Sequence, residues 1–368
     1  MTEKEALIVL NMLPGIGPLK VRDLISFVGG ATKVLQSDRE TLLAVSGIGN
    51  KLVDDLLNWN NIVNLENELE LIEKAGVSIV TFNDSQYPEL LKEIYDPPLL
   101  LYVRGTLPTN NDRLISIVGS RRVTRYGRKI CENISASAAY NGWSIISGLA
   151  YGIDAVAHRA TLDAGGKTIG VLGGGLLRFH PQDHLNMARE MIDNGGAVIS
   201  EFPMEYSPNK RSFPMRNRII SGLSMGTIVV EAGFKSGSLI TAKFALDQGR
   251  TVFAVPGQVD NPQARGTNAL IKDGAVLTES FDDVLEEFEF STFENIPENG
   301  NVVTSVASLE LSDDEKMILD IIQEERDISA DILASKSGLQ VGSLLSVLMQ
   351  LEMKKIIVQL PGKRYAPK

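Results

Sequence analysis

The most constraining feature of the sequence is a series of short apolar runs that alternate with helical stretches from Leu114 to Val255. Such alternation is typical of βαβ units, in which helices cover both faces of a parallel sheet. Several runs end in glycine or small polar residues, and ligands of these sheets bind outside the carboxyl ends of the strands. The pattern predicts an α/β fold with a doubly wound, mainly parallel sheet and strands at 114–118, 143–146, 167–172, 197–202, 227–230 and 251–255.

Residues 1–82 have a different pattern, of short amphipathic helices with a weak internal repeat. A Gly-Ile-Gly turn at 15–17 is echoed by another at 47–49. Glycines at such turns let backbone N–H groups at a helix start approach a phosphate, as in a helix-hairpin-helix. The same glycines also suit a compact turn between helices, and Asp54 and Asp55 would repel DNA. We expect a small helix-hairpin-helix or SAM-like domain, and both roles for its turns stay open.

The carboxyl-terminal part of the chain predicts a linker and a further small domain. Acidic residues around Pro297 make 289–310 typical of a flexible acidic linker. Residues 311–368 then contain three helical segments and a β-wing around 361–362, which predicts a winged helix. Its third helix, expected near 341–351, carries no charged residue, whereas base recognition needs Arg, Lys, Asn or Gln on an exposed face. We favour a protein-contact or accessory role here over direct DNA recognition.

The distribution of charge singles out the middle of the chain. The formal net charge of −10 argues at first against nucleic acid as a ligand, because neutralising phosphates needs Lys and Arg. Residues 112–265, however, hold 18 Lys and Arg against 12 Asp and Glu, a balance of +6, which leaves −16 for the two flanks together. The predicted sheet is therefore the basic part of the chain.

Three elements that lie near predicted strand ends are candidates for binding phosphates. Small residues admit a phosphate to the backbone, hydroxyls hydrogen-bond to it, and arginine makes bidentate contacts with its oxygens. Cations interleaved with an aromatic side chain suit single strands, because aromatic faces stack unpaired bases. The candidates are Gly119, Ser120, Arg121 and Arg122 in the first element, Lys210, Arg211, Phe213, Arg216, Asn217 and Arg218 in the second, and Ser236, Gly237 and Ser238 in the third.

Each of these elements also has a purely structural interpretation. Phe213 could belong to the core, and some of the arginines could pair with Glu201 or Glu231. Ser236 or Ser238 could do no more than cap its helix.

No pattern in the sequence predicts catalysis, a metal or a cofactor. Residues 165–168 resemble the end of a Walker A loop, but its lysine leads into a strand and the first glycine is missing. The run of glycines at 173–175 has Arg178 where a dinucleotide fingerprint needs its last glycine. His180 and His184 have no soft ligand nearby. We expect no catalytic residue, no metal ligand and no cofactor.

The cysteine content and the first residues bear on the compartment. Cys131 is the only cysteine and cannot form an intramolecular disulfide, and the start of the chain has no basic segment followed by an apolar run. No stretch approaches 18 uncharged apolar residues. We expect a cytoplasmic protein without a membrane span.

The order and spacing of motifs in the middle section resemble the DprA/Smf family. The resemblance covers residues 86–279 strongly and the ends in outline. The motifs that carry it are Ile117-Val118-Gly119-Ser120-Arg121, Ser147-Gly148-Leu149-Ala150, Gly152-Ile153-Asp154, Phe213-Pro214, Arg216-Asn217-Arg218, Val230-Glu231-Ala232, Ser236-Gly237-Ser238-Leu239-Ile240-Thr241-Ala242 and Val255-Pro256-Gly257.

This resemblance implies an extended Rossmann domain over 83–288 that binds single-stranded DNA in a basic pocket. It also implies a homodimer that helps a RecA-type recombinase onto DNA taken up in natural transformation. By position, the loop 119–121 and Lys210 would hold phosphates. Where relatives tend to have a basic residue after Tyr-Pro, this chain has Gln182, so that part of the pocket lacks a charge.

The resemblance also suggests an alternative function. At the level of the fold, the family is similar to Rossmann-like enzymes that cleave nucleotide N-glycosidic bonds, and Glu231 would then be the catalytic carboxylate. Those enzymes have a Pro-Gly-Gly-x-Gly-Thr run around the glutamate. This chain has only Gly226-Thr227 before it, which disfavours the enzyme.

Overall fold

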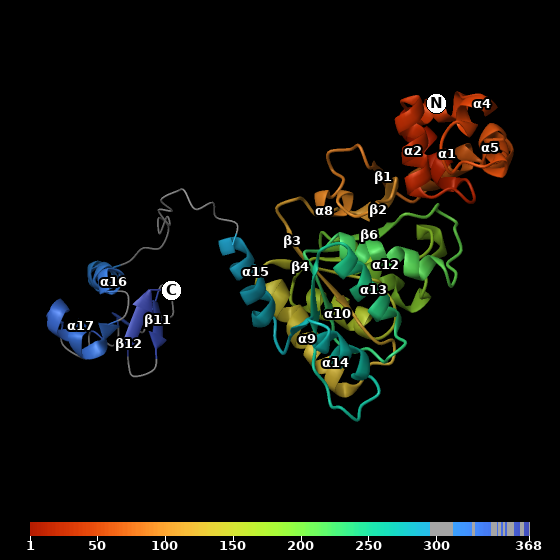
Figure 1. The fold of residues 1–368 in the computed structure, drawn as a ribbon. Helices are drawn as coiled ribbons and strands as arrows, with labels where there is room; N and C mark the ends of the chain where they lie inside the picture. Colours follow the sequence, from red (N-terminus) through yellow and green to blue (C-terminus); the bar gives the residue numbers. More distant parts are fainter. Residues whose placement is uncertain are drawn as a thin grey trace. The chain divides into compact units, whose positions relative to one another are not determined.

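The computed structural model describes residues 1–294, 312–325, 328–339, 357–360 and 364–367, together with 344, 347, 348, 350 and 351. The chain forms two compact units, Met1–Asn295 and Ile296–Lys368 (Figure 1).

A nine-stranded sheet forms the centre of the larger unit. The strand order is β1-β2-β6-β5-β4-β3-β7-β8-β9. The strands from β3 to β9 pair in parallel, whereas β1 and β2 form an antiparallel edge beside β6. The strands are β1 (Ser78–Thr81), β2 (Leu100–Gly105), β3 (Arg113–Val118), β4 (Trp143–Ser147), β5 (Thr168–Val171), β6 (Ala197–Ser200), β7 (Gly226–Val229), β8 (Thr251–Ala254) and β9 (Val276–Leu277).

The six predicted strands are confirmed, and their ends shift by at most two residues. The strands β1, β2 and β9 are not among the predictions. β1 lies inside the segment assigned to the helical domain, yet it pairs with β2 in the sheet, so the sheet begins at Ser78 rather than after residue 82. β1 and β2 precede the repeating alternation of strands and helices on which the prediction rests, and β1 directly follows a helical stretch.

Helices cover both faces of the sheet, as its apolar strands require. Side chains of β3 alternate between the faces, so Ile115 and Ile117 pack with α9, α10 and α15 on one face, and Leu114 and Val118 with α12 and α13 on the other. None of the described helices is long and apolar enough to cross a membrane. The helices are α8 (Glu89–Lys92), α9 (Arg125–Tyr140), α10 (Ile153–Asp163), α11 (Leu185–Asp193), α12 (Ser212–Gly222), α13 (Gly237–Asp247), α14 (Arg265–Lys272) and α15 (Asp282–Glu294).

The amino-terminal helices share a core with the sheet. They pack against Tyr102 of β2 and against Met204, so they belong to the same compact unit. Each Gly-Ile-Gly turn lies between two helices, with φ of 76° at Gly15 and 78° at Gly47, and its contact with DNA stays a prediction. The helices are α1 (Glu3–Met12), α2 (Pro18–Val28), α3 (Ala31–Gln36), α4 (Arg39–Leu43), α5 (Asn50–Leu57), α6 (Trp59–Ile62) and α7 (Leu65–Lys74).

In the smaller unit, the described residues include a three-stranded antiparallel sheet of order β10-β12-β11 and the helices α16 and α17, which share one core. Residues 289–294 of the expected linker belong to α15, and the rest of it lies outside the described residues. The expected third helix lies mostly, and the wing turn wholly, outside them. The elements are α16 (Asp313–Glu325), β10 (Ile328–Ser329), α17 (Ala330–Ser337), β11 (Ile357–Leu360) and β12 (Arg364–Pro367).

Gly152 holds the start of α10 against the loop that follows β3. Its φ of 84° and ψ of −129° form a conformation that only glycine adopts readily. A Cβ atom there would lie 2.2 Å from the carbonyl oxygen of Ser120 and 2.6 Å from Cα of Arg121. The close approach of the two backbones therefore depends on this glycine.

We expect Gly152→Ala to lower the free energy of unfolding by roughly 2–5 kcal/mol, because backbone strain and a backbone clash add. Gly142→Ala is the matched control, since Gly142 also has a positive φ (75°) but nothing within 4 Å of a Cβ. The control should cost only about 1–2 kcal/mol. Urea unfolding followed by circular dichroism measures both, and equal losses would contradict the steric role of Gly152.

Candidate functional site

A pocket lies where the order of the parallel strands reverses. β4, β5 and β6 follow on one side of β3, and β7, β8 and β9 on the other. The loops after β3 and β7 lead to α9 and α13 on opposite faces, so they diverge and leave a crevice at the carboxyl ends of the strands. The pocket has a volume of about 560 Å³, and eleven of the thirteen predicted site residues line it.

The loop after β3 is held in place and presents two arginines. The Ser120 hydroxyl accepts a hydrogen bond from the backbone N–H of Arg122 (3.1 Å), which closes a tight turn. Gly119 leaves no room for a side chain, because a Cβ would lie 2.6 Å from Ile153. Arg121 and Arg122 are exposed and line the pocket, so their guanidinium groups can meet an anion there.

The start of α13 provides a second anion-binding element. Ser236 is the N-cap and accepts a long hydrogen bond from the backbone N–H of Ser238 (3.4 Å). A Cβ on Gly237 would meet nothing within 4 Å, so the backbone is open to a ligand at this point. All three residues line the pocket. The capping role is confirmed, and the same residues offer a helix N-terminus that attracts negative charge.

The segment before α12 carries Lys210, and the first turn of α12 carries Phe213. Asn209 accepts hydrogen bonds from the backbone N–H groups of Arg211 (2.9 Å) and Ser212 (3.1 Å), which fixes the turn around Lys210. Lys210 is exposed and lines the pocket, whereas Arg211 is exposed but does not line it. The guanidinium carbon of Arg121 lies 5.5 Å from the centroid of the Phe213 ring, a cation–π contact that places Arg121.

Arg216 and Asp154 form the buried floor of the pocket. The Arg216 guanidinium donates hydrogen bonds to the carbonyl oxygens of Gly148 (2.6 Å) and Val171, and the side chain is 4% exposed. Burial lowers the pKa of Arg216 to about 10, with Asp154 opposing and Arg121 adding to the shift. Burial likewise raises the pKa of Asp154, which Arg216 opposes. Arg216 keeps its charge at neutral pH, but it serves first to hold the loops after β4 and β5.

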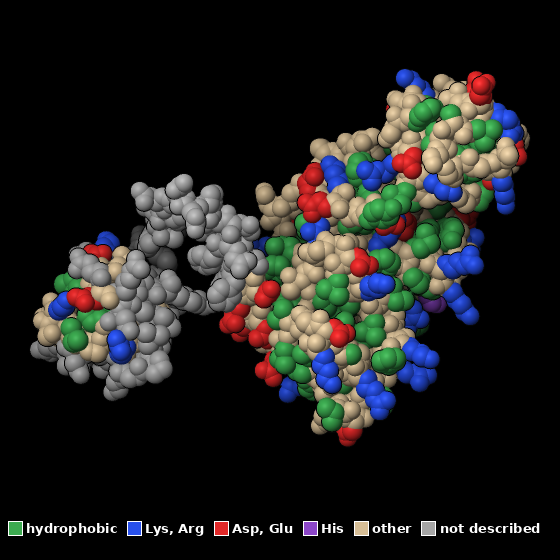
Figure 2. Space-filling model, viewed as in Figure 1, with side chains coloured by type: hydrophobic (Ala, Val, Ile, Leu, Met, Phe, Trp, Pro, Cys, Tyr) green, Lys and Arg blue, Asp and Glu red, His purple; other side chains and the backbone are tan. Residues whose placement is uncertain are grey.

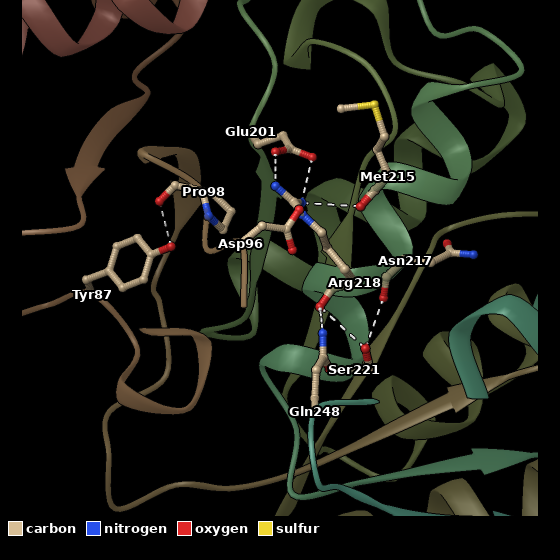
Figure 3. A network of polar contacts seen from close by, with 9 residues as sticks. All are labelled: Tyr87, Asp96, Pro98, Glu201, Met215, Asn217, Arg218, Ser221 and Gln248. Carbon is tan, nitrogen blue, oxygen red and sulfur yellow. Dashed lines mark hydrogen bonds and ion pairs between the residues drawn. The ribbon is translucent and has the colours of Figure 1, made fainter. Parts of the chain in front are cut away.

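Arg218 lies in the core instead of the pocket (Figure 3). Its guanidinium pairs with Glu201 (2.6 Å) and Asp96 (2.9 Å), and the side chain is 4% exposed. Burial alone would lower the pKa of Arg218, but the two carboxylates raise it. The prediction that Arg218 contacts DNA is therefore corrected, because this arginine is the structural partner of Glu201.

Glu231 is also committed to the fold. Its carboxylate accepts hydrogen bonds from the backbone N–H of Thr124 (2.9 Å) and from the Thr124 hydroxyl, at the start of α9. A Cβ on Gly127 would lie 2.3 Å from the same carboxylate, so α9 packs directly on it. Glu231 is 3% exposed and does not line the pocket. Its position disfavours the alternative in which it attacks or protonates a nucleotide.

Several residues that line the pocket are absent from the predicted set. Asp154, Ile240 and Thr241 lie within predicted motifs, and Ile240 and Thr241 follow Gly237 by three and four positions, a helical spacing that could have indicated them. Gln263 comes from the loop after β8, and its carbonyl oxygen accepts a hydrogen bond from the N–H of Ala232 (2.8 Å). A lone glutamine in a loop gives no sequence signal.

The charge of the pocket agrees with an anionic ligand. Four cationic side chains line it (Arg121, Arg122, Lys210 and Arg216) against the single carboxylate of Asp154. In Figure 2, Lys and Arg side chains gather along the right-hand edge of the larger unit, whereas Asp and Glu gather along its left edge over α15. On the face that Figure 2 shows, cationic and acidic side chains are thus concentrated at opposite edges of the larger unit.

Comparisons with known proteins match this chain to one family. The family model described as DNA recombination-mediator protein A matches residues 78–289, and the DprA winged helix domain matches 304–363. Protein Smf of Escherichia coli is 38% identical over 304 residues, covering 81% of this chain and 79% of that protein. The crystal structure of DNA processing protein A from Streptococcus pneumoniae is 35% identical, with a TM-score of 0.67, covering 78% of this chain and 98% of that one.

A further solved structure bears on the ligand. DNA processing protein A from Helicobacter pylori is 28% identical with a TM-score of 0.52, covering 58% of this chain and 97% of that one. The Helicobacter pylori protein has a single-stranded DNA binding mode that is described as unique.

We expect Arg218→Met to lower the free energy of unfolding by about 3–5 kcal/mol, because it leaves the buried carboxylate of Glu201 without its partner. Arg178→Ala is the control, since Arg178 pairs with Glu205 at the surface (3.2 Å) and such pairs contribute about 1 kcal/mol or less. Urea unfolding of both variants provides the measurement. A value for Arg218→Met within about 1 kcal/mol of the unsubstituted protein would contradict its structural role.

Proposed function

Because the chain belongs to the DNA recombination-mediator protein A family, also called DprA or Smf, we propose that its pocket binds single-stranded DNA. The observation that carries the proposal is the convergence of the loop after β3, the start of α13 and Lys210 on one pocket at the switch point of the sheet. The Helicobacter pylori protein, which binds single strands, has the same fold.

The pocket offers complementary contacts to the phosphodiester backbone. The backbone N–H of Gly237 and the hydroxyls of Ser236 and Ser238 can hold one phosphate at this helix N-terminus. Arg121 and Arg122 can reach neighbouring oxygens as bidentate donors, and Lys210 adds a mobile point charge. None of these contacts reads a base edge, so we expect binding that is independent of sequence and sensitive to salt.

Single strands fit this site better than duplexes do. Bases of a single strand are free to turn toward protein side chains, whereas bases of a duplex are paired and stacked inside it. The crevice lies between the loops after β3 and β7, and Phe213 and its neighbours offer apolar surface to an unpaired base. The proposed ligand is therefore a single strand held by phosphates, with bases near Phe213.

We further propose that the protein acts as a homodimer that helps a RecA-type recombinase onto DNA entering by natural transformation, in the cytoplasm. The family supports this role, and two copies would present two strands side by side. The buried free thiol of Cys131 agrees with a reducing compartment. Sedimentation equilibrium at micromolar concentration should give a dimer, and a monomer would contradict this part of the proposal.

We expect Arg121→Ala and Lys210→Ala each to weaken single-strand binding and to flatten its salt dependence. Each lost phosphate contact should reduce the slope of log K against log salt by about 0.7. Fluorescence anisotropy of a labelled oligonucleotide at several salt concentrations gives both quantities.

The control for these two variants is Lys74→Ala, which removes one positive charge from α7, outside the pocket. It should leave the slope unchanged, because exposed charges away from the strand are screened. Slopes for Arg121→Ala and Lys210→Ala equal to that of the control would remove both residues from the phosphate contact.

A further inference from the structure

Phe234 lies exposed beside the pocket, in the turn that leads from β7 to α13. The backbone N–H of Ser236 donates to the carbonyl oxygen of Gly233 (2.9 Å), so Phe234 and Lys235 form the tip of a turn. The side chain of Phe234 is 75% exposed. Such exposure is unfavourable for a phenyl ring, because burying apolar surface away from water lowers the free energy. None of the pocket or core contacts described above uses this ring.

The turn is bounded on both sides by residues that line the pocket. Ser236 follows Phe234 by two positions and caps α13 at the proposed phosphate site. On the other side, a Cβ on Gly233 would lie 3.8 Å from the side-chain oxygen of Gln263, which also lines the pocket. Phe234 therefore stands at the rim of the site, two residues before Ser236 and three before Gly237, where the start of α13 would hold a phosphate.

Phe213, the aromatic residue that the sequence singles out, is only partly available for stacking. Arg121 lies over its ring, with 5.5 Å from the guanidinium carbon to the ring centroid. The ring also presses on Gly173, where a Cβ would come within 2.8 Å of it. Phe213 is thus partly buried and positions a cation, so a base bound here needs a second apolar surface.

We propose that Phe234 stacks on an unpaired nucleobase of the bound strand. The proposal rests on the proposed single-strand function and deepens it. The phosphate would be held at the start of α13 and in the loop after β3, and the base attached to a neighbouring sugar would lie on the exposed ring. Every base has an aromatic face, so this contact adds affinity without adding sequence preference.

Stacking and phosphate contacts can be separated by removing the bases. The test compares a labelled oligothymidylate with an abasic oligonucleotide of equal length, titrated by anisotropy at one salt concentration. We expect Phe234→Ser to weaken binding of the oligothymidylate by roughly 5- to 100-fold, as measured stacking contacts do, and to leave abasic binding unchanged. The salt slope should not change, because no charge is lost.

Two further variants make the test specific. Phe234→Trp keeps an aromatic face, so it should retain oligothymidylate binding, and its fluorescence should be quenched by that strand but not by the abasic one. Tyr95→Ser is the matched control, since Tyr95 is an 84% exposed aromatic residue between α8 and β2 and does not line the pocket. It should bind both strands like the unsubstituted protein.

The outcomes distinguish this proposal from the function on which it rests. If Phe234→Ser binds oligothymidylate normally, or loses both strands equally, Phe234 does not stack on bases and its exposure has another purpose, such as a protein contact. In both cases the single-strand function would stand. If the unsubstituted protein binds neither strand, the proposed function fails, and the stacking proposal fails with it.

Discussion

The reversal of strand order at β3 is the constraint from which the rest of the site follows. A sheet buried on both faces has no polar surface except at its ends and edges, so a ligand can reach it only where two loops diverge. The loops after β3 and β7 lead to helices on opposite faces, and the crevice between them collects small residues, hydroxyls and cations. Gly152 is needed because two backbones approach each other closely there, and Gly119 because the Ile153 side chain occupies the space of a Cβ.

The cationic side chains around the site divide into two groups, and burial decides the role of each. Arg218 pairs with two carboxylates and Arg216 binds backbone carbonyls, so both fix the segments around the pocket. Arg121 and Lys210 are exposed and keep their charges available to a ligand. A chain of net charge −10 can thus present a cationic pocket, because four cations line the crevice against the single carboxylate of Asp154.

Much of the fold could be predicted because most of its parallel strands are apolar runs in a repeating alternation with helices. The edge strands β1 and β2 could not, since they precede that repeating alternation. In the site, Arg216, Asn217 and Arg218 are consecutive polar residues, and the sequence does not distinguish their roles. Their side chains differ in direction, because consecutive helical residues point about 100° apart. One therefore reaches the pocket floor, one reaches α13, and one reaches Glu201 in the core, and only the packing of α12 reveals which.

The central claim is that this crevice holds a single strand by its phosphates. The most direct measurement is a titration of the full chain with a labelled single strand and with the matched duplex, followed by anisotropy across a range of salt concentrations. We expect tighter binding of the single strand, with an affinity that falls linearly in log K against log salt. Equal or tighter binding of the duplex, or no binding of either, would contradict the claim.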